Sequence, residues 1–365
     1  MTPRLRPATF DDYQQIVGLE TTLSADVPSE AQWRLRWTGN PLWPTLEQRW
    51  PIGWVMEAHD GKIVGSIGNI PLRYYFRGEP LVATTGRGWV VAPEYRGFAL
   101  WLLEERFNQS NVDLFIDTTI SPLALAAFDA FALRVPVGDW ETIAYFVTGH
   151  RAFATRALQK LNVPLAPIWA TLAGPALRLK ESLIDKKPPQ RGSSLKIDDA
   201  ETFDSRFDLF WQELLRQNPD TLLAARDSAT LAWYFSCAMR ARRLWILTAT
   251  RSDRLVAYCI FKRQSAEGQL ARMRLVDYQT LAPEDDPLAD FLAIALQRCA
   301  VRGVSVLDRP GVGVTQTHTF DAHAPYRAKQ SWPFFYRAVS ADLAAQLALP
   351  QAWAPSAYDG DASFE

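Results

Sequence analysis

The chain has 365 residues, more than one small domain usually holds, so its length predicts two domains. A hydrophobic content of 48% and a charged content of 22% are those of a folded globular protein and exclude disorder over most of the chain. The 39 Lys and Arg residues balance the 40 Asp and Glu residues. A DNA- or RNA-binding protein would usually carry a basic excess, so this class is not expected.

Cysteines, histidines and apolar runs limit the chemistry further. Cys237, Cys259 and Cys299 form no CxxC pair, and four histidines are few for a His-rich site, so we expect neither a metal cofactor nor a disulfide scaffold. The amino-terminal residues lack the apolar core of a signal peptide. No run of about 18 apolar residues predicts a membrane-spanning helix. Together these features predict a cytoplasmic protein.

The first part of the chain alternates between helices and strands. Thr9 or Asp11 is the expected N-cap of the first helix, and the Asp60-Gly61 pair predicts a hairpin turn. In chain order, the predicted elements are a strand at 4–8, helices at 12–23 and 29–37, strands at 53–58, 63–76 and 81–91, a helix at 98–107, a strand at 113–120, a helix at 121–133 and a strand at 141–147.

A similar order of elements follows a proline-interrupted helical stretch at 151–184 and a linker at 186–194, KKPPQRGSS. The later elements are helices at 203–217 and 228–239, strands at 244–250, 255–263 and 270–281, a helix at 287–301, a strand at 304–308 and a closing strand at 334–339. We therefore predict domains at 1–150 and 195–345, joined by a helical connector and linker at 151–194. The Ala- and Pro-rich tail at 346–365 is expected to fray.

One stretch combines the features of a phosphate-binding turn. A strand ends in Val90 and Val91, a Pro-containing turn follows, and Arg96-Gly97 opens a helix. Such a junction exposes backbone N–H groups at the positive end of the helix dipole, where a pyrophosphate binds. Small residues let the backbone approach the phosphates closely.

The first 147 residues resemble the GNAT family, the acyl-CoA-dependent N-acyltransferases. The segment RLRPATFDD at 4–12 is similar to the family's opening strand and helix, EAHDGKIVG at 57–65 to its hairpin, and VAPEYRG at 91–97 to the entry of its CoA loop. The second half resembles the family in element order alone. The resemblance implies an α/β (α+β) fold of two tandem GNAT-like domains, each a mixed, mostly antiparallel sheet flanked by helices, with a groove between them.

The resemblance also implies transfer of an acyl group from acetyl-CoA or another acyl-CoA to an amine acceptor, which is a small molecule or a surface or cell-wall precursor. The implied donor-binding residues are Val90, Val91, Arg96, Gly97, Phe98, Ala99 and Trp101. A backbone N–H near Val90 would stabilise the oxyanion. Ala99 stands where the family has Gly, and Trp101 where it has Gly or Ala. The Trp101 ring either points away from the loop or fills the pyrophosphate space.

Acid–base residues of the family are missing from the first half. Phe128 aligns with a frequent general-acid Tyr, and strand 81–91 lacks the frequent Glu base. In the second half, the carboxylates of residues 284–286 would repel a pyrophosphate. An amine must be neutral to attack a thioester, so Asp277, His323 and Tyr326 are the candidate catalytic residues. A structural hydrogen-bonding role for Asp277, and a solvated loop for His318 and His323, are the alternatives.

Several alternatives stay open at this point. In one alternative, the donor is an acyl-carrier protein or an aminoacyl-tRNA instead of CoA. In another, the protein is a GNAT-like binding module without activity. The apolar segment 163–179, flanked by basic residues, either contacts a membrane surface and presents a lipid-linked substrate or packs between the two halves. The 14 tryptophans either line a groove or fill the core.

Overall fold

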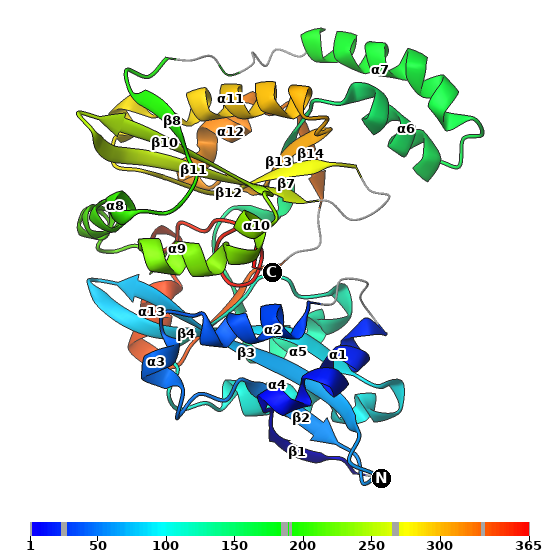
Figure 1. Cartoon of the computed structure of the whole chain (residues 1–365), viewed down its shortest axis with the longest axis vertical. Helices are drawn as coiled ribbons and strands as arrows, with labels where there is room; N and C mark the ends of the chain where they lie inside the picture. Colours follow the sequence, from blue (N-terminus) through cyan, green and yellow to red (C-terminus); the bar gives the residue numbers. More distant parts are fainter. Residues whose placement is uncertain are drawn as a thin grey trace.

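The structure is a computed structural model that describes residues 2–22, 28–183, 189, 192–264, 270–329 and 333–364. Two mixed sheets flanked by helices form its two halves, stacked along the long axis of the molecule (Figure 1). All strand pairs are antiparallel except β4 with β5 and β12 with β13, which are parallel. The predicted fold class is confirmed.

The first sheet is built around a long antiparallel hairpin. Its strands in spatial order are β1 (Arg4–Pro7), β2 (Gly53–Glu57), β3 (Ile63–Phe76), β4 (Glu79–Val91), β5 (Leu114–Asp117), β15 (Phe335–Ala338) and β6 (Leu133–Arg134), with β9 (Leu223–Ala224) paired to β3. The predicted strand 63–76 has the predicted bounds. Gly61 in the preceding turn has φ +80°, a conformation that glycine adopts without strain.

The second sheet carries the remaining strands. In spatial order they are β14 (Tyr326–Lys329), β7 (Asp139–Val147), β13 (Val306–Val312), β12 (Arg272–Thr280), β11 (Arg254–Gln264), β10 (Leu244–Arg251) and β8 (Lys196–Ala200). The α-helices of the chain are α1 (Tyr13–Thr21), α2 (Glu30–Thr38), α3 (Trp43–Leu46), α4 (Ala99–Phe107), α5 (Leu125–Phe131), α6 (His150–Lys160), α7 (Ala166–Leu183), α8 (Ser205–Gln217), α9 (Ser228–Tyr234), α10 (Ser236–Arg240), α11 (Leu288–Val301), α12 (His318–His323) and α13 (Ala341–Leu347).

The two halves exchange strands. β7 pairs with β13 and β14 in the second sheet, although it precedes the connector in the sequence. β15 inserts between β5 and β6 of the first sheet. Both strands form where they were predicted, but their assignment to sheets was wrong. Periodicity predicts that a segment is a strand, whereas the edge available in the folded chain decides which sheet it joins.

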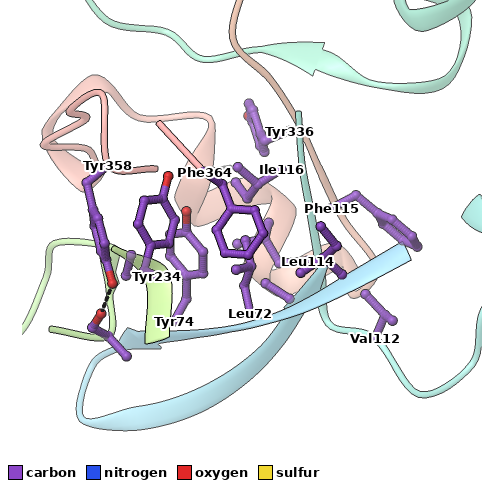
Figure 2. Packing of buried hydrophobic residues seen from close by; sticks show 14 of the residues in the cluster. Leu72, Tyr74, Val112, Leu114, Phe115, Ile116, Tyr234, Tyr336, Tyr358 and Phe364 are labelled. Carbon is purple, nitrogen blue, oxygen red and sulfur yellow. Dashed lines mark hydrogen bonds between the residues drawn. The ribbon is translucent and has the colours of Figure 1, made fainter. Parts of the chain in front are cut away.

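The predicted fraying of the tail is also wrong, because residues 353–364 lie largely buried between the halves (Figure 1). The Tyr358 ring lies 4.5 Å from that of Tyr234, and the Phe364 ring 5.1 Å from the same ring, centroid to centroid (Figure 2). The tail carboxylates find partners too: Tyr74 donates to Asp359 at 3.0 Å. Aromatic burial and paired polar groups therefore hold the tail in place.

Most of the tryptophans fill the core, which was one of the two alternatives; the other was that they line a groove. The buried ones are Trp33, Trp37, Trp43, Trp50, Trp54, Trp140, Trp211, Trp233, Trp245 and Trp353. The indole nitrogens of Trp37 and Trp50 both donate to the Asn69 carbonyl oxygen, at 2.7 and 2.9 Å. These hydrogen bonds connect α2, which carries Trp37, and the segment before β2, which carries Trp50, to the middle of β3.

The connector consists of α6 and α7, which pack on each other at the outer end of the second half, away from the first sheet (Figure 1). Of the predicted linker, residues 186–188, 190 and 191 lie outside the described residues. Gly192 and Ser193 donate backbone N–H groups to Asp290 of α11, at 2.7 and 3.0 Å. In the described part of the chain, no helix is long and apolar enough to cross a membrane.

Candidate functional site

The site begins where β4 and β5 separate. Their parallel pairing covers only Ala83–Leu114 and Thr84–Phe115. Beyond these two pairs, the Gly86 amide donates to Asp117 Oδ1 at 2.9 Å. At this point the Asp117 side chain, and not a backbone carbonyl of β5, accepts the hydrogen bond from β4. Asp117 is buried and paired with Arg106 at 2.9 Å. Burial raises the pKa of Asp117, and the Arg106 guanidinium opposes that effect. The two strands therefore diverge around a fixed ion pair.

A bulge follows on β4. The register of the β3–β4 pair shifts so that Gly68 faces Arg87 while Ser66 faces Val90. Gly88 lies within this bulge at φ +66°, where glycine is favoured. A Cβ on Gly88 would lie 2.1 Å from Glu20 Oε1. The glycine thus makes room for a carboxylate from α1 directly against the β4 backbone.

Charged side chains gather on the α1 and α2 side of this bulge. Glu20 and Arg36 line a small cavity together with Ser66 and Arg87. Burial raises the pKa of Glu20, while the charges of Arg36 and Arg87 lower it. Arg87 Nη1 donates to the Phe364 carbonyl oxygen at 3.2 Å and lies 3.8 Å from Asp361 Oδ2, so the tail meets the site here.

The Arg-Gly turn lies next to this cluster along the chain. It forms the 3-10 helix η2 (Pro93–Phe98), which runs directly into α4. Arg96 and Gly97 are exposed, and a Cβ on Gly97 would meet no atom within 4 Å. The Ala99 amide already donates to the Arg96 carbonyl oxygen. An incoming phosphate would therefore find the Arg96 side chain and the open backbone at Gly97.

The predicted donor-binding residues lie on one continuous path: Val90 and Val91 end β4, Arg96, Gly97 and Phe98 belong to η2, and Ala99 and Trp101 open α4. The half-buried Trp101 ring packs on that of Phe98, with centroids 4.9 Å apart. Trp89 Nε1 donates to the Ala99 carbonyl oxygen at 3.3 Å and fixes the start of α4 against the bulge. Phe128 is buried and packs on Trp89, so it offers no phenol to this site.

The residues predicted for catalysis in the second half are not brought together. Asp277 lies on β12 and Tyr326 on β14, with β7 and β13 between them, which puts these strands about 14 Å apart. His323 ends α12. Buried Asp277 accepts hydrogen bonds from Arg226 at 2.9 and 3.1 Å and from Tyr258 at 2.8 Å. The Tyr326 ring stacks on Tyr145. The catalytic role of Asp277, His323 and Tyr326 therefore stays a prediction, and the structure does not bring the three side chains together in one site.

The carboxylates of the acidic loop in the second half accept hydrogen bonds from other residues of the protein. Asp285 accepts from Ser194 Oγ at 2.7 Å and from Arg251 at 3.0 Å. Asp286 accepts from the Leu288 amide at 2.9 Å and from Tyr278. These carboxylates lie between β12 and α11, and the Arg-Gly turn lies between β4 and α4, so the two segments have the same place in the order of elements. Within the described residues, no group of three or more His, Cys, Asp or Glu side chains is placed to hold a metal ion.

Sequence reasoning missed Glu20 and Arg36. It searched strand 81–91 for an acidic base, whereas the carboxylate at the bulge comes from the first helix. The signal was present in the glycines of Gly86-Arg87-Gly88, since a glycine inside a strand marks a bulge or a close approach. Which side chain makes that approach depends on how α1 packs, and the strand pattern does not contain this information.

Comparison with known proteins shows the fold. No protein-family model and no curated protein match the sequence. A GCN5-related N-acetyltransferase from Anabaena variabilis aligns over 93% of this chain and 73% of its own, with a TM-score of 0.55 and 12% identity. An Enterococcus faecalis protein described as a probable N-acyltransferase gives the same values. Saccharomyces cerevisiae N-myristoyltransferase with bound myristoyl-CoA aligns over 92% and 83%, with a TM-score of 0.51 and 12% identity.

The chain therefore has the fold of the GCN5-related N-acetyltransferases, the GNAT fold. Each of these solved chains aligns across both halves of the molecule. The likeness extends to the arrangement of the two sheets, and it is consistent with two tandem domains.

Proposed function

We propose that the protein is an N-acyltransferase that moves an acyl group from acyl-CoA to an amine. The observation that carries this proposal is the divergence of β4 and β5 directly beside the Arg-Gly turn. A thioester entering between the strands would meet the β4 backbone at the bulge. The GNAT fold supports the reaction class, and the yeast relative in fold has a fatty acyl-CoA bound.

The donor would bind along the path from β4 to α4. The exposed Arg96 side chain and the open backbone at Gly97 would contact the pyrophosphate, at the positive end of α4. The acyl carbonyl would then reach a backbone N–H near Val90, which stabilises negative charge on oxygen as the tetrahedral intermediate forms. Cys237, Cys259 and Cys299 are free thiols, which fits a reaction in the reducing cytoplasm.

Glu20 would act as the general base. Its carboxylate lies against Gly88, two residues before Val90. If the acyl carbonyl binds near Val90, the carboxylate would lie close to the carbon that an amine must attack. Burial raises its pKa, which brings the carboxylate closer to the strength that proton transfer at neutral pH requires. The amine gives its proton to Glu20, its nitrogen forms a bond to the acyl carbon, and CoA leaves as the thiolate when the C–S bond breaks.

The test begins with calorimetric titration of CoA and acetyl-CoA into the full chain. We expect micromolar binding that is at least about tenfold weaker in Arg96→Ala, while the control Arg4→Ala, at an exposed arginine of β1, binds as wild type. A thiol-release assay with a panel of amines then measures transfer. No binding at millimolar CoA would refute the CoA donor and favour an acyl-carrier protein, an aminoacyl-tRNA or a binding module without activity.

A further inference from the structure

Arg36 is a buried cation that has no ion-pair partner among the residues that the structure describes. It lies on α2 and is only 5% exposed, beside a small cavity whose walls include Trp33, Trp37 and Ile52. Its Nε is buried and makes no hydrogen bond. Among the residues that the structure describes, none pairs with its guanidinium within 4.0 Å. Burying a charge in this way is unfavourable unless an opposite charge is supplied.

The neighbouring charges do not supply this partner. Arg87 faces the same cavity but already contacts the Phe364 carbonyl oxygen and lies near Asp361. Glu20 lies against Gly88 and forms no ion pair with Arg36. Burial, assisted by the charge of Arg87, lowers the pKa of Arg36 to about 9, and the more distant charges of Glu20 and Asp361 oppose this shift only in part. The guanidinium therefore stays protonated at neutral pH. Among the described residues, none accepts a hydrogen bond from the buried Nε of Arg36, so the cavity holds a charged donor with an unused N–H group.

We propose that Arg36 binds the carboxylate of the acyl acceptor, so that the acceptor is a small molecule carrying both an amine and a carboxylate, such as an amino acid. A guanidinium matches the planar carboxylate in a two-bond arrangement. With the carboxylate on Arg36, the amine of the same small molecule faces Glu20 and the β4 bulge. This inference rests on the proposed function.

The test measures binding separately from turnover. Calorimetry with CoA present compares the twenty proteinogenic amino acids with their α-amides, which keep the amine and lose the charge. We expect at least one acid to bind, with its amide at least about tenfold weaker. Arg36→Met should reduce the acid to the level of the amide. The matched control is Arg34→Met on the same helix, where Arg34 is paired with Glu30 at 2.8 Å and should not matter.

A second readout needs no ligand. Removing an unpaired buried charge should raise the melting temperature of Arg36→Met above that of wild type. Arg34→Met, which loses an exposed ion pair with Glu30 and a contact with the Phe10 ring, should not raise it. Equal binding of acids and amides, no binding of any acid, or equal competition by inorganic phosphate would overturn the carboxylate proposal. If an acid binds through Arg36 but no thiol is released, the proposed function fails while this site stands.

An independent observation concerns the connector. Helix α7 packs on α6 through a face of small residues, where a Cβ on Gly174 would already lie 3.2 Å from Arg151 Cα. Its opposite face and the preceding turn expose large apolar side chains: Leu161, Leu165, Ile168, Trp169, Leu172 and Leu179 are 55–73% exposed. We call these six residues the hairpin surface. From Leu165 onward their spacing places them on one side of the helix.

The charged residues between positions 142 and 180 are all basic. The exposed basic residues Arg151, Lys160 and Arg178 flank it, and the sequence contains no Asp or Glu from residue 142 to residue 180. The helices lie at the outer end of the molecule, away from the first sheet (Figure 1). We also propose that the hairpin surface docks on an anionic phospholipid membrane. An apolar stripe bordered by cations is the pattern of a helix that lies in the membrane interface.

Vesicle co-sedimentation of the full chain tests this proposal. We expect binding to vesicles with 30% phosphatidylglycerol to exceed binding to pure phosphatidylcholine at least about tenfold, and to be lost in Ile168→Ser/Leu172→Ser. The control is Leu209→Ser on α8, an apolar side chain with a matching exposure of 67%. Unchanged vesicle binding of the double variant would overturn the proposal. So would a wild-type dimer that the double variant converts to monomer, since a second copy would then cover the surface.

Discussion

Replacing Asp277 by alanine should lower the free energy of unfolding by about 3–5 kcal/mol, because it leaves Arg226 buried without its counter-ion. Arg226 and Asp277 are each 1% exposed and joined by two bonds of 2.9 and 3.1 Å. Tyr258, which donates to Asp277 at 2.8 Å, loses its acceptor as well. A loss of this size is a large share of the about 5–15 kcal/mol that stabilises a typical protein.

Urea unfolding followed by circular dichroism and tryptophan fluorescence measures the change. Tyr258→Phe removes one bond to a charged acceptor and should cost less, about 1.5–3 kcal/mol. The double variant Arg226→Met/Asp277→Leu removes both charges and should recover much of the loss of Asp277→Ala. The reasoning is refuted if Asp277→Ala unfolds within about 1 kcal/mol of wild type. Loss of acyl transfer at full stability would instead make Asp277 catalytic.

Three further predictions concern the first half and the carboxy-terminal tail. Burial raises the pKa of Glu20, so the protonated side chain stabilises the folded state below pH about 4.5, and this stabilisation is lost as the pH rises through the folded-state pKa. Glu20→Gln should therefore be more stable than wild type at pH 8 and equally stable at pH 4. The variant should also lack the acidic limb of the pH–rate profile. Equal stability at both pH values would contradict this. Trp101→Ala should bind CoA about tenfold more tightly by calorimetry if the ring fills the pyrophosphate space, and unchanged affinity would show that it points away. Phe364→Ala should cost about 3–5 kcal/mol in urea unfolding, since the ring packs on Trp233 and Tyr234; a cost under about 1 kcal/mol would mean that the tail is not held.

Local structure could be predicted from the sequence because its causes are local. The hairpin around Asp60-Gly61 follows from turn chemistry and strand alternation, and strand 63–76 has the predicted bounds. The Arg-Gly turn was likewise found where a strand runs into a helix. Each of these features depends on residues within a few positions of one another.

What the sequence did not reveal depends on distant partners. Asp359 and Asp361 suggest a solvated tail, yet Thr118 donates to Asp361 at 2.9 Å across 243 positions of the chain. Glu20 meets Gly88 only because α1 packs on β3 and β4. No periodicity or spacing contains such a pairing, so the contact between Glu20 and Gly88 became evident only from the folded structure.

Residues 1–150 expressed alone should fail to fold cooperatively, although their sequence resembles a complete domain. Without the second half, β5 loses its pairing with β15, and β7 loses β13 and β14. The fragment also loses four aromatic side chains that pack against it or complete its sheet: Phe335, Tyr336, Tyr358 and Phe364, each at most 7% exposed. At about 1.5–3 kcal/mol for each buried side chain, the loss is about 6–12 kcal/mol.

That loss is comparable with the whole stability of a domain, so we expect strand β15 and the tail together to make the two halves one folding unit. Thermal unfolding by circular dichroism checks the fragment, with the full chain as control. Co-expression with residues 151–365 should restore a cooperative transition, because it returns β15 and the tail to the first sheet. A sharp transition of the fragment alone would refute the argument, since the first sheet would then close without the strand that it receives from the second half.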